Sequence, residues 1–183
     1  MLNSSTFREN KAVQIPATVV TIGAMLLLPF LVHFIPSASP VPMGARLLPL
    51  FYAPLLAAIF FHPAVGLVAA LIAPLLNHAL TGMPESGMVV ILIVELVVFT
   101  VAMQQLNHRW PAFGGFAPFA FVMAKVASLL MLLVIPVSFI AAPPVQYFLG
   151  SLRMALPGMA ILLVINLIAV WAKQRSGRGR DGA

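Results

Sequence analysis

The stretch LLPLFYAPLLAAIFFHPAVGLVAALIAPLLNHAL, residues 47–80, decides how this chain folds, because it holds 34 residues without one Asp, Glu, Lys or Arg. A helix that crosses a bilayer needs about 20 apolar residues, so this stretch is too long for one crossing. Pro63 interrupts it, since proline removes a backbone donor and clashes with the preceding turn. The sequence therefore predicts a helical hairpin, Leu47–Phe61 followed by Pro63–Leu80, with a very short turn at His62.

The composition extends this conclusion to the whole chain. Of the 183 residues, 62% are apolar and 8% are charged, whereas an average soluble domain is about 45–50% apolar and about 25% charged. So few charged side chains cannot cover the surface of a soluble domain, and a lipid bilayer is the natural solvent. The high hydrophobicity excludes intrinsic disorder. The lack of cysteine excludes a disulfide scaffold and thiolate metal sites.

Four further apolar stretches complete the prediction of an all-α integral membrane protein with six transmembrane helices. Outside the hairpin, the stretches long enough to cross are Val13–Ile35, Gly87–Gln104, Phe116–Ile140 and Gly150–Trp171. We expect residues 13–172 to form one membrane domain, with residues 1–12 as an N-terminal tail and 173–183 as a basic C-terminal tail. Leu47–Phe61 is short for a full crossing, so we expect it either to begin earlier or to tilt little.

Basic residues predict the orientation of the helices. Six spans put both ends of the chain on one side of the membrane, together with the turn at His62 and the loop 106–115. The opposite loops contain Arg46, whereas the first side contains Arg8, Lys11, Arg109, Lys173, Arg175, Arg178 and Arg180. Because Lys and Arg concentrate in cytoplasmic loops, we expect both termini to be cytoplasmic and the protein to lie in a bacterial cytoplasmic (inner) membrane. The net charge of +6 is then a topology signal, and we expect no nucleic-acid partner.

Two charged residues are expected deep in the membrane. Glu95 lies eight residues into its predicted span, and Lys125 lies nine residues into the next span, which runs the other way. A charge at the bilayer centre costs about 2.5–3.5 kcal/mol on insertion scales, so each residue needs a partner or a function. The matching depths favour a buried Glu95–Lys125 pair. This pair is either part of a substrate-binding site or a structural ion pair.

Other polar residues are expected near the outer face. Arg153 lies three residues into the last span, where its guanidinium either binds a carboxylate bidentately or reaches outward to lipid headgroups. Asn77 and His78 end the third span, Glu85 follows in the next loop, and Tyr147 precedes the last span. The candidate substrate-binding residues are therefore Asn77, His78, Glu95, Lys125, Tyr147 and Arg153.

Small side chains mark one face of the first span. Ala17, Thr21 and Ala24 lie nearly above one another on a helix. Small residues allow helices to approach closely in lipid, so this face is a candidate docking surface for a partner. Packing within the chain is an equally good explanation.

Motifs for catalysis are lacking in the sequence. It contains no GxxxxGK[ST] phosphate loop and no HExxH metal motif. Only four acidic residues occur, and no two are placed to act together as general acid and base. We therefore expect a non-enzymatic protein with no catalytic residue, no metal site and no cofactor. A small ligand site or a scaffold fits better.

A more specific pattern runs from Leu47 to Phe99. It has a Leu-Pro start, a Pro-Leu-Leu helix, a turn, a second helix ending in Pro-Leu-Leu, a Gly-Met-Pro loop and a Glu in the next helix. These features are Leu48-Pro49, Pro54–Leu56, His62-Pro63, Pro74–Leu76, Gly82-Met83-Pro84 and Glu95. The block resembles the substrate-binding (S) components of energy-coupling-factor (ECF) vitamin transporters, in particular the pantothenate-like branch. It covers under a third of the chain. The chain departs from that branch at His62, where the family has a turn glycine, and at Ala17-x-x-x-Thr21, where the family has Ala-x-x-x-Ala.

The resemblance implies a mechanism and partners. An S component captures a vitamin-like small molecule from outside and then docks on a membrane coupling subunit that carries two cytoplasmic ATPase subunits. The resemblance implies that the outer polar residues bind the ligand and that the Ala17, Thr21 and Ala24 face docks. Arg153 and Lys125 favour a carboxylate-bearing ligand. Two alternatives stay open: a six-span scaffold of cell-envelope assembly without a ligand, and a small proton-coupled carrier that uses Glu95.

Overall fold

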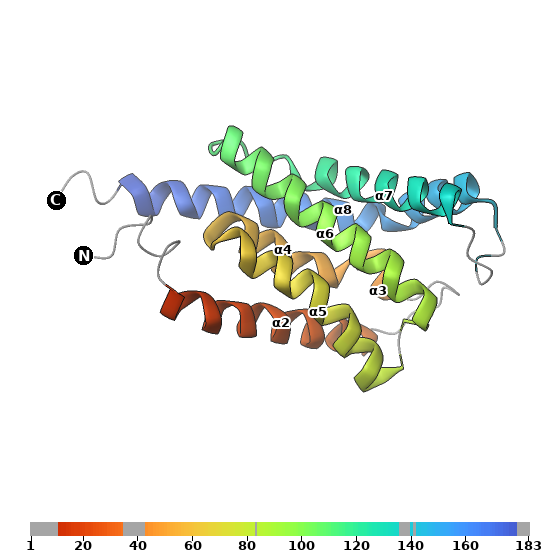
Figure 1. Cartoon of the computed structure of the whole chain (residues 1–183). Helices are drawn as coiled ribbons and strands as arrows, with labels where there is room; N and C mark the ends of the chain where they lie inside the picture. Colours follow the sequence, from red (N-terminus) through yellow and green to blue (C-terminus); the bar gives the residue numbers. More distant parts are fainter. Residues whose placement is uncertain (1–10, 35–42, 83, 136–139, 141, 179–183) are drawn as a thin grey trace.

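The structure, a computed structural model, describes residues 11–34, 43–82, 84–135, 140 and 142–178. Within these residues every regular element is a helix, and the helices pack side by side into an elongated bundle (Figure 1). Their bounds are α2 (Lys11–His33), α3 (Met43–Leu47), α4 (Pro49–Phe60), α5 (Pro63–Thr81), α6 (Ser86–Arg109), α7 (Ala117–Val134) and α8 (Pro144–Arg178).

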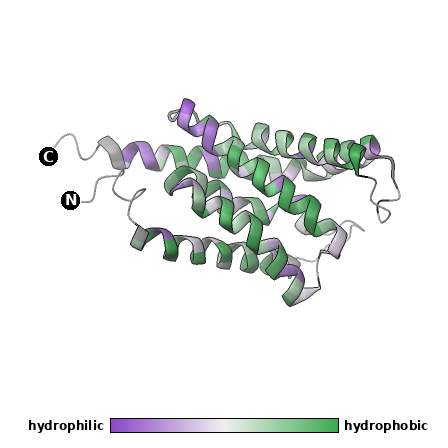
Figure 2. Ribbon diagram, viewed as in Figure 1, coloured by the Kyte–Doolittle hydropathy of each residue, from purple (hydrophilic) through white to green (hydrophobic). Residues whose placement is uncertain are grey.

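In the described part of the chain, six segments are long and apolar enough to cross a membrane, as the sequence predicts. They are Ala12–Val32, Met43–Phe60, Pro63–Thr81, Ser86–Arg109, Ala117–Val134 and Pro144–Ser176. Figure 2 shows the same division, with hydrophobic colour along most of each helix and hydrophilic colour gathered toward helix ends. The prediction of an all-helical chain with six helices long and apolar enough to span a membrane is therefore confirmed for the described residues.

The bundle has two different ends. Helices α2 and α5 begin, and α6 and α8 end, at the left of Figure 1, which we call the terminal end. The opposite end, where α2, α5 and α7 end and α4, α6 and α8 begin, is called the far end. The first and last described residues of the chain thus lie at the same end, as expected for six crossings.

The predicted hairpin forms, and its first half begins earlier than Leu47. Helix α3 supplies the missing length, so that the span starts at Met43. At the turn, His62 caps α5 because its Nδ1 accepts a hydrogen bond from the backbone N–H of Ala64 at 3.2 Å. Pro63 follows at the first helical position, where a missing N–H costs nothing. His62 has φ −65°, so the turn here contains no positive φ at this position and does not require glycine.

Leu48 separates α3 from α4 in a left-handed conformation, with φ 57° and ψ 41°. A bulky residue rarely adopts a positive φ, so the surroundings must hold it there. The hydroxyl of Tyr52 donates to the carbonyl of Leu47. On α8, Gly158 lies so close that a Cβ there would be 2.6 Å from Leu48 Cγ and 2.7 Å from Arg46 O. Only a glycine allows α8 to approach the helix break this closely.

Helix α4 is the centre of the bundle. It contacts α2, α5, α6 and α8, and eight of its 12 residues are buried. Many of the core residues around it are alanines, such as Ala57, Ala70, Ala102 and Ala155. Small side chains let the surrounding helices pack closely where no hydrophobic effect drives them together.

Several of the expected spans differ in their bounds. Helix α6 continues to Arg109, five residues beyond the expected Gln104, so residues 106–109 of the expected loop are helical. Helix α8 begins at Pro144, six residues before the expected Gly150, and continues to Arg178. Pro144 favours an earlier start because proline suits the first turn of a helix. The boundary expected at residue 172 therefore falls inside α8. Helix α7 ends at Val134, whereas the expected span continued to Ile140, and residues 136–139 lie outside the described part of the chain.

Candidate functional site

A cavity of about 480 Å³ lies at the far end of the bundle. Its walls come from α3, the start of α4, the end of α5, the first three turns of α6 and one face of α8, with Pro29 of α2 and Lys125 of α7. The lining runs from exposed Glu85 to buried Glu95. These two residues are ten positions apart on one helix, which corresponds to a depth of about 15 Å. The cavity therefore reaches from the surface of the described chain to about the middle of the bundle.

An ion pair forms the inner end of the cavity. The ammonium Nζ of Lys125 lies 2.8 Å from both carboxylate oxygens of Glu95. The two residues are 9% and 3% exposed, and both line the cavity. The pair predicted from their matching depths is confirmed. Each charge offsets the desolvation cost of the other, because a lone charge at this depth would be costly.

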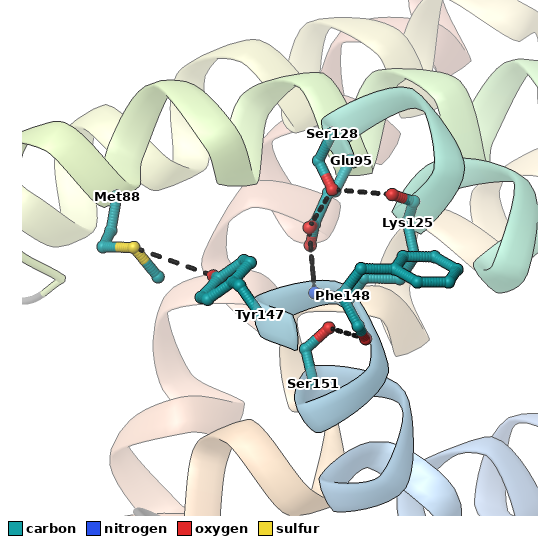
Figure 3. A network of polar contacts seen from close by, with 7 residues as sticks. All are labelled: Met88, Glu95, Lys125, Ser128, Tyr147, Phe148 and Ser151. Atoms are coloured by element: carbon teal, nitrogen blue, oxygen red, sulfur yellow. Dashed lines mark hydrogen bonds and ion pairs between the residues drawn. The ribbon is translucent and has the colours of Figure 1, made fainter. Parts of the chain in front are cut away.

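Ser128 is the third member of this cluster. It lies one turn after Lys125 on α7, and its hydroxyl is 2.8 Å from Oε1 of Glu95 and 3.0 Å from the carbonyl of Lys125 (Figure 3). Oε1 therefore accepts from two groups, whereas Oε2 has only the Lys125 contact among the described residues. This asymmetry leaves hydrogen-bonding capacity on Oε2.

Three aromatic rings pack together beside the ion pair. The Phe51 ring meets those of Phe99 and Phe121 edge to face, with centroids 5.1 and 5.2 Å apart, a favourable geometry. Phe99 and Phe121 are fully buried. The ammonium of Lys125 is 5.5 Å from the Phe121 ring centroid, within the range of a cation–π contact. Phe51 lines the cavity, and the buried rings of Phe99 and Phe121 pack against it.

One face of α8 forms a wall of mixed polarity. Tyr147, Ser151, Met154 and Ala155 line the cavity, and their spacing of four, three and one residues puts them on the same side of the helix. The hydroxyl of Tyr147 points across to the sulfur of Met88 on α6 at 3.8 Å, as Figure 3 shows. The hydroxyl of Ser151 donates to its own helix at the carbonyl of Phe148, 2.8 Å away.

Of the six predicted substrate-binding residues, the structure brings four to the cavity: Asn77, Glu95, Lys125 and Tyr147. His78 has another position. Its Nδ1 donates to the carbonyl of Pro84 at 2.7 Å, and its own carbonyl accepts from Gly82, which has φ 71°. His78 thus ties the end of α5 to the loop before α6, and it positions the cavity rim without lining the cavity.

Arg153 lies away from the cavity. It is two residues from Ser151, which is about 200° around the helix, so it projects from the opposite side of α8. Its side chain is exposed, and it is not among the cavity-lining residues. The expected placement near the end of a span also changes, because α8 begins earlier and Arg153 is its tenth residue. In this conformation the guanidinium cannot contact a ligand in the cavity.

The small-residue face of α2 turns toward the bundle. Ala17 and Thr21 are 7% and 6% exposed, and Ala24 is half-buried. Ala17 packs with Ala57 of α4 and Val65 of α5. In this structure the chain's own helices cover Ala17 and Thr21, which leaves them no room for another protein. The outward face of α2 instead carries large apolar residues such as Val19, Val20 and Phe30.

Sequence reasoning missed several lining residues. It also missed Ser128, which bonds to Glu95 without lining the cavity. Ser128 had a usable signal, because it is three residues from Lys125 on the same predicted helix and thus on the same face. Ser151 and Met154 could be identified only after it was known which side of α8 faces the cavity. Gly44 and Ala45 could not be identified from the sequence. The helix break at Leu48 brings them to the cavity, and no residue pattern predicts that break. Among the described residues, no three His, Asp or Glu side chains are close enough to hold a metal ion.

Comparison of the chain with protein-family models, with curated proteins and with solved structures finds no match in any of the three.

Proposed function

We propose that this protein is a substrate-capturing membrane subunit of an ECF-type importer of vitamins or similar micronutrients. In this proposal it binds a small molecule in the far-end cavity, from the outer side of a bacterial cytoplasmic membrane, and catalyses no reaction. The observation that carries the proposal is the cavity itself, which ends at the Glu95–Lys125 pair.

The size and lining of the cavity support ligand capture. Sites for small molecules usually have volumes of about 300–1,000 Å³ and are mostly apolar with a few polar groups, and this cavity has about 480 Å³. Its apolar wall includes Leu50, Ile91 and Leu92, and its polar groups converge from α5, α6, α7 and α8. A protein that acts only as a scaffold does not need a cavity with a buried ion pair at its inner end.

The distribution of charge supports capture from outside. The far end is opposite the terminal end, where the cationic residues Arg109, Lys173 and Arg175 lie. Since cations concentrate on the cytoplasmic side, the cavity would open away from the cytosol. An importer that binds its substrate outside the cell, before ATP is hydrolysed, requires a binding cavity that opens to the outer side.

The partners in this proposal are a membrane coupling subunit and two cytoplasmic ATPase subunits. The chain has no GxxxxGK[ST] motif of its own, so ATP-driven release would require separate ATPases. This part of the proposal rests on the sequence resemblance from Leu47 to Phe99.

The first test is to purify the protein without added ligand and identify any bound small molecule by mass spectrometry. We expect one compound to co-purify and to be lost from the variant Glu95→Gln/Lys125→Met. The variant Arg153→Met should retain it, because Arg153 lies outside the cavity lining. If no compound co-purifies and none of a panel of vitamins stabilises the protein against heat, ligand capture is ruled out and the scaffold hypothesis gains.

A proton-coupled carrier is a second candidate, favoured by one observation. Glu95 is buried near the middle of the bundle and yet lines the cavity, as a proton-accepting carboxylate in a carrier would. Uptake by cells that lack every coupling ATPase, abolished by Glu95→Gln, would favour this function. Uptake that requires the ATPases would favour the importer.

A further inference from the structure

The charges of the cavity restrict the ligands that can reach its inner end. Among the residues that line it, those with a formal charge are Glu85, Glu95 and Lys125. Glu95 and Lys125 neutralise each other at 2.8 Å, and Glu85 adds a negative charge at the exposed end. Arg153, the other cation expected there, lies on the opposite side of α8. Among the described residues that line the cavity, no cation is therefore left over to balance an anionic ligand.

The ion pair nevertheless has hydrogen-bonding capacity left. A lysine ammonium has three N–H donors and a carboxylate can accept about four hydrogen bonds. The contacts of Lys125 with Glu95 use two donors, and among the described residues Glu95 accepts only from Lys125 and Ser128. One donor on Nζ and one acceptor position on Oε2 are therefore left, and both residues line the cavity. The donor and the acceptor lie side by side, because the two atoms are 2.8 Å apart.

We propose that the ligand group which reaches this pair is uncharged and presents a hydrogen-bond acceptor next to a donor, as an amide, lactam or ureido group does. The inference rests on the proposed capture function and narrows its substrate class. The ligand's C=O would accept from Lys125 Nζ, and its N–H would donate to Glu95 Oε2. Both contacts are charge-assisted, and such hydrogen bonds are the stronger kind.

Charged ligand groups fit this position less well. A carboxylate could accept from Lys125 but would lie beside the carboxylate of Glu95, and an ammonium would lie beside Lys125. Either would leave an unbalanced charge near the middle of the membrane, which is the situation the ion pair avoids. An amide adds no charge and satisfies both groups.

The remaining wall sets the character of the rest of the ligand. Between the ion pair and the exposed end, the cavity is bordered by Phe51, Met88, Ile91, Leu92 and Met154. Aromatic and thioether groups accept a flat or irregular apolar body. The ligand is thus an amphipathic molecule with an apolar body and a neutral polar head that enters first.

The test uses a matched probe series on the purified full chain in lipid nanodiscs. The probes are 3-phenylpropanamide, 3-phenylpropanoate, 3-phenylpropylammonium and propylbenzene, which differ only in the head group. Affinities are taken from the ligand-dependent shift in thermal unfolding and from saturation-transfer NMR, with empty nanodiscs to subtract partition into lipid. The amide should bind at least about tenfold more tightly than either charged probe. The carboxylate probe would lie beside Glu95 and the ammonium probe beside Lys125, and like charges in a buried site are strongly unfavourable.

Variants show whether the ion pair sets this preference. In Glu95→Gln/Lys125→Met, the amide should lose about tenfold in affinity, while propylbenzene binding stays unchanged. The variant Arg153→Met should behave as the wild type. The ranking of probes on the wild type tests the inference even if the double variant does not fold.

The outcomes separate this inference from the proposed function. If the carboxylate or the ammonium binds most tightly, the neutral-ligand inference is overturned while ligand capture stands. If propylbenzene alone binds, the cavity takes apolar molecules and the inference also fails. If none of the four probes binds, the inference fails, whereas the capture function fails only if, in addition, no compound co-purifies and no vitamin stabilises the protein.

Discussion

The polar side chains around the Glu95–Lys125 pair have different hydrogen-bond partners from those at the terminal end of the bundle. At the terminal end they satisfy backbone groups: Asn166 accepts from the N–H of Ala117 at 3.1 Å, Lys173 donates to the carbonyl of Ile59 at 2.9 Å, and Gln104 donates to the carbonyl of Pro63 at 2.9 Å. At the far end, Glu95, Lys125 and Tyr147 bond to other side chains and face a cavity.

The difference follows from what each end must do. Helix ends leave unpaired backbone N–H and C=O groups, and a polar side chain from a neighbouring helix is the direct way to satisfy them in a dry environment. At the terminal end, Asn166, Lys173 and Gln104 are therefore engaged with backbone groups of neighbouring helices. At the far end, the Glu95–Lys125 pair keeps hydrogen-bonding capacity and lines a cavity, and this is why we propose the far end as the ligand-binding end.

Removing one member of the ion pair should have the largest effect. Lys125→Met leaves Glu95 buried without a counter-charge, and breaking a buried pair in this way costs about 3–5 kcal/mol of stability. Thermal or denaturant unfolding in detergent measures the loss.

The double variant Glu95→Gln/Lys125→Met is the control, because it removes both charges and should fall within about 1 kcal/mol of the wild type. Equal losses in the single and double variants would show that the pair does not act as one unit.

Filling the contact at the α3–α4 break should have the next largest effect. Gly158→Ala would put a Cβ 2.6–2.8 Å from atoms of Arg46, Leu47 and Leu48, and we expect this overpacking to cost about 1–3 kcal/mol. The matched control is Gly150→Ala in the same helix, where no atom lies within 4 Å and alanine should be neutral or stabilising by up to about 1 kcal/mol. A Gly158→Ala variant as stable as Gly150→Ala would contradict the close approach of α8 to Leu48.

Removing a cap at the terminal end should cost less and should spare the cavity. Asn166 is 1% exposed and caps the start of α7, so Asn166→Ala should lower the free energy of unfolding by about 1–2 kcal/mol. Binding of propylbenzene, measured by NMR at a temperature where the variant is folded, should not change. A large loss of binding would mean that the two ends are coupled and that their roles are not separate.

Removing the charge of Arg153 should have the smallest effect. Its side chain is exposed and has no hydrogen bond or ion pair among the described residues, so Arg153→Met should change stability by no more than about 0.5 kcal/mol. Probe binding should also be unchanged. A marked loss of binding would return Arg153 to the ligand site and contradict its placement here.

The sequence was sufficient for the spans because length and hydropathy determine them. The run 47–80 with Pro63 in it can form only a hairpin, and the depths of Glu95 and Lys125 follow from counting 1.5 Å per residue from either end of their helices. The ion pair could therefore be predicted from the sequence alone.

The cavity could not be predicted in the same way. It depends on the turn at Leu48, and a leucine before a proline normally favours an extended conformation and not a left-handed one. It also depends on the rotation of α8, which sends Tyr147 and Ser151 inward and Arg153 outward. Rotation is set by packing, for example by Gly158 against Leu48. The polar residues of α8 lie on more than one side of the helix, so they do not indicate which side faces the cavity.

Both proposals depend on a water-accessible cavity that opens at the far end and runs down to the ion pair. The chain has no cysteine, so single cysteines can report on this cavity without background. We would place one at Ser151, in the cavity wall, and one at Leu156 of the same helix, which is 61% exposed on the apolar surface, and treat intact cells with a small charged thiosulfonate that cannot cross the membrane. We expect rapid modification at position 151 and none at position 156, whereas equal inertness at both positions would contradict an open cavity.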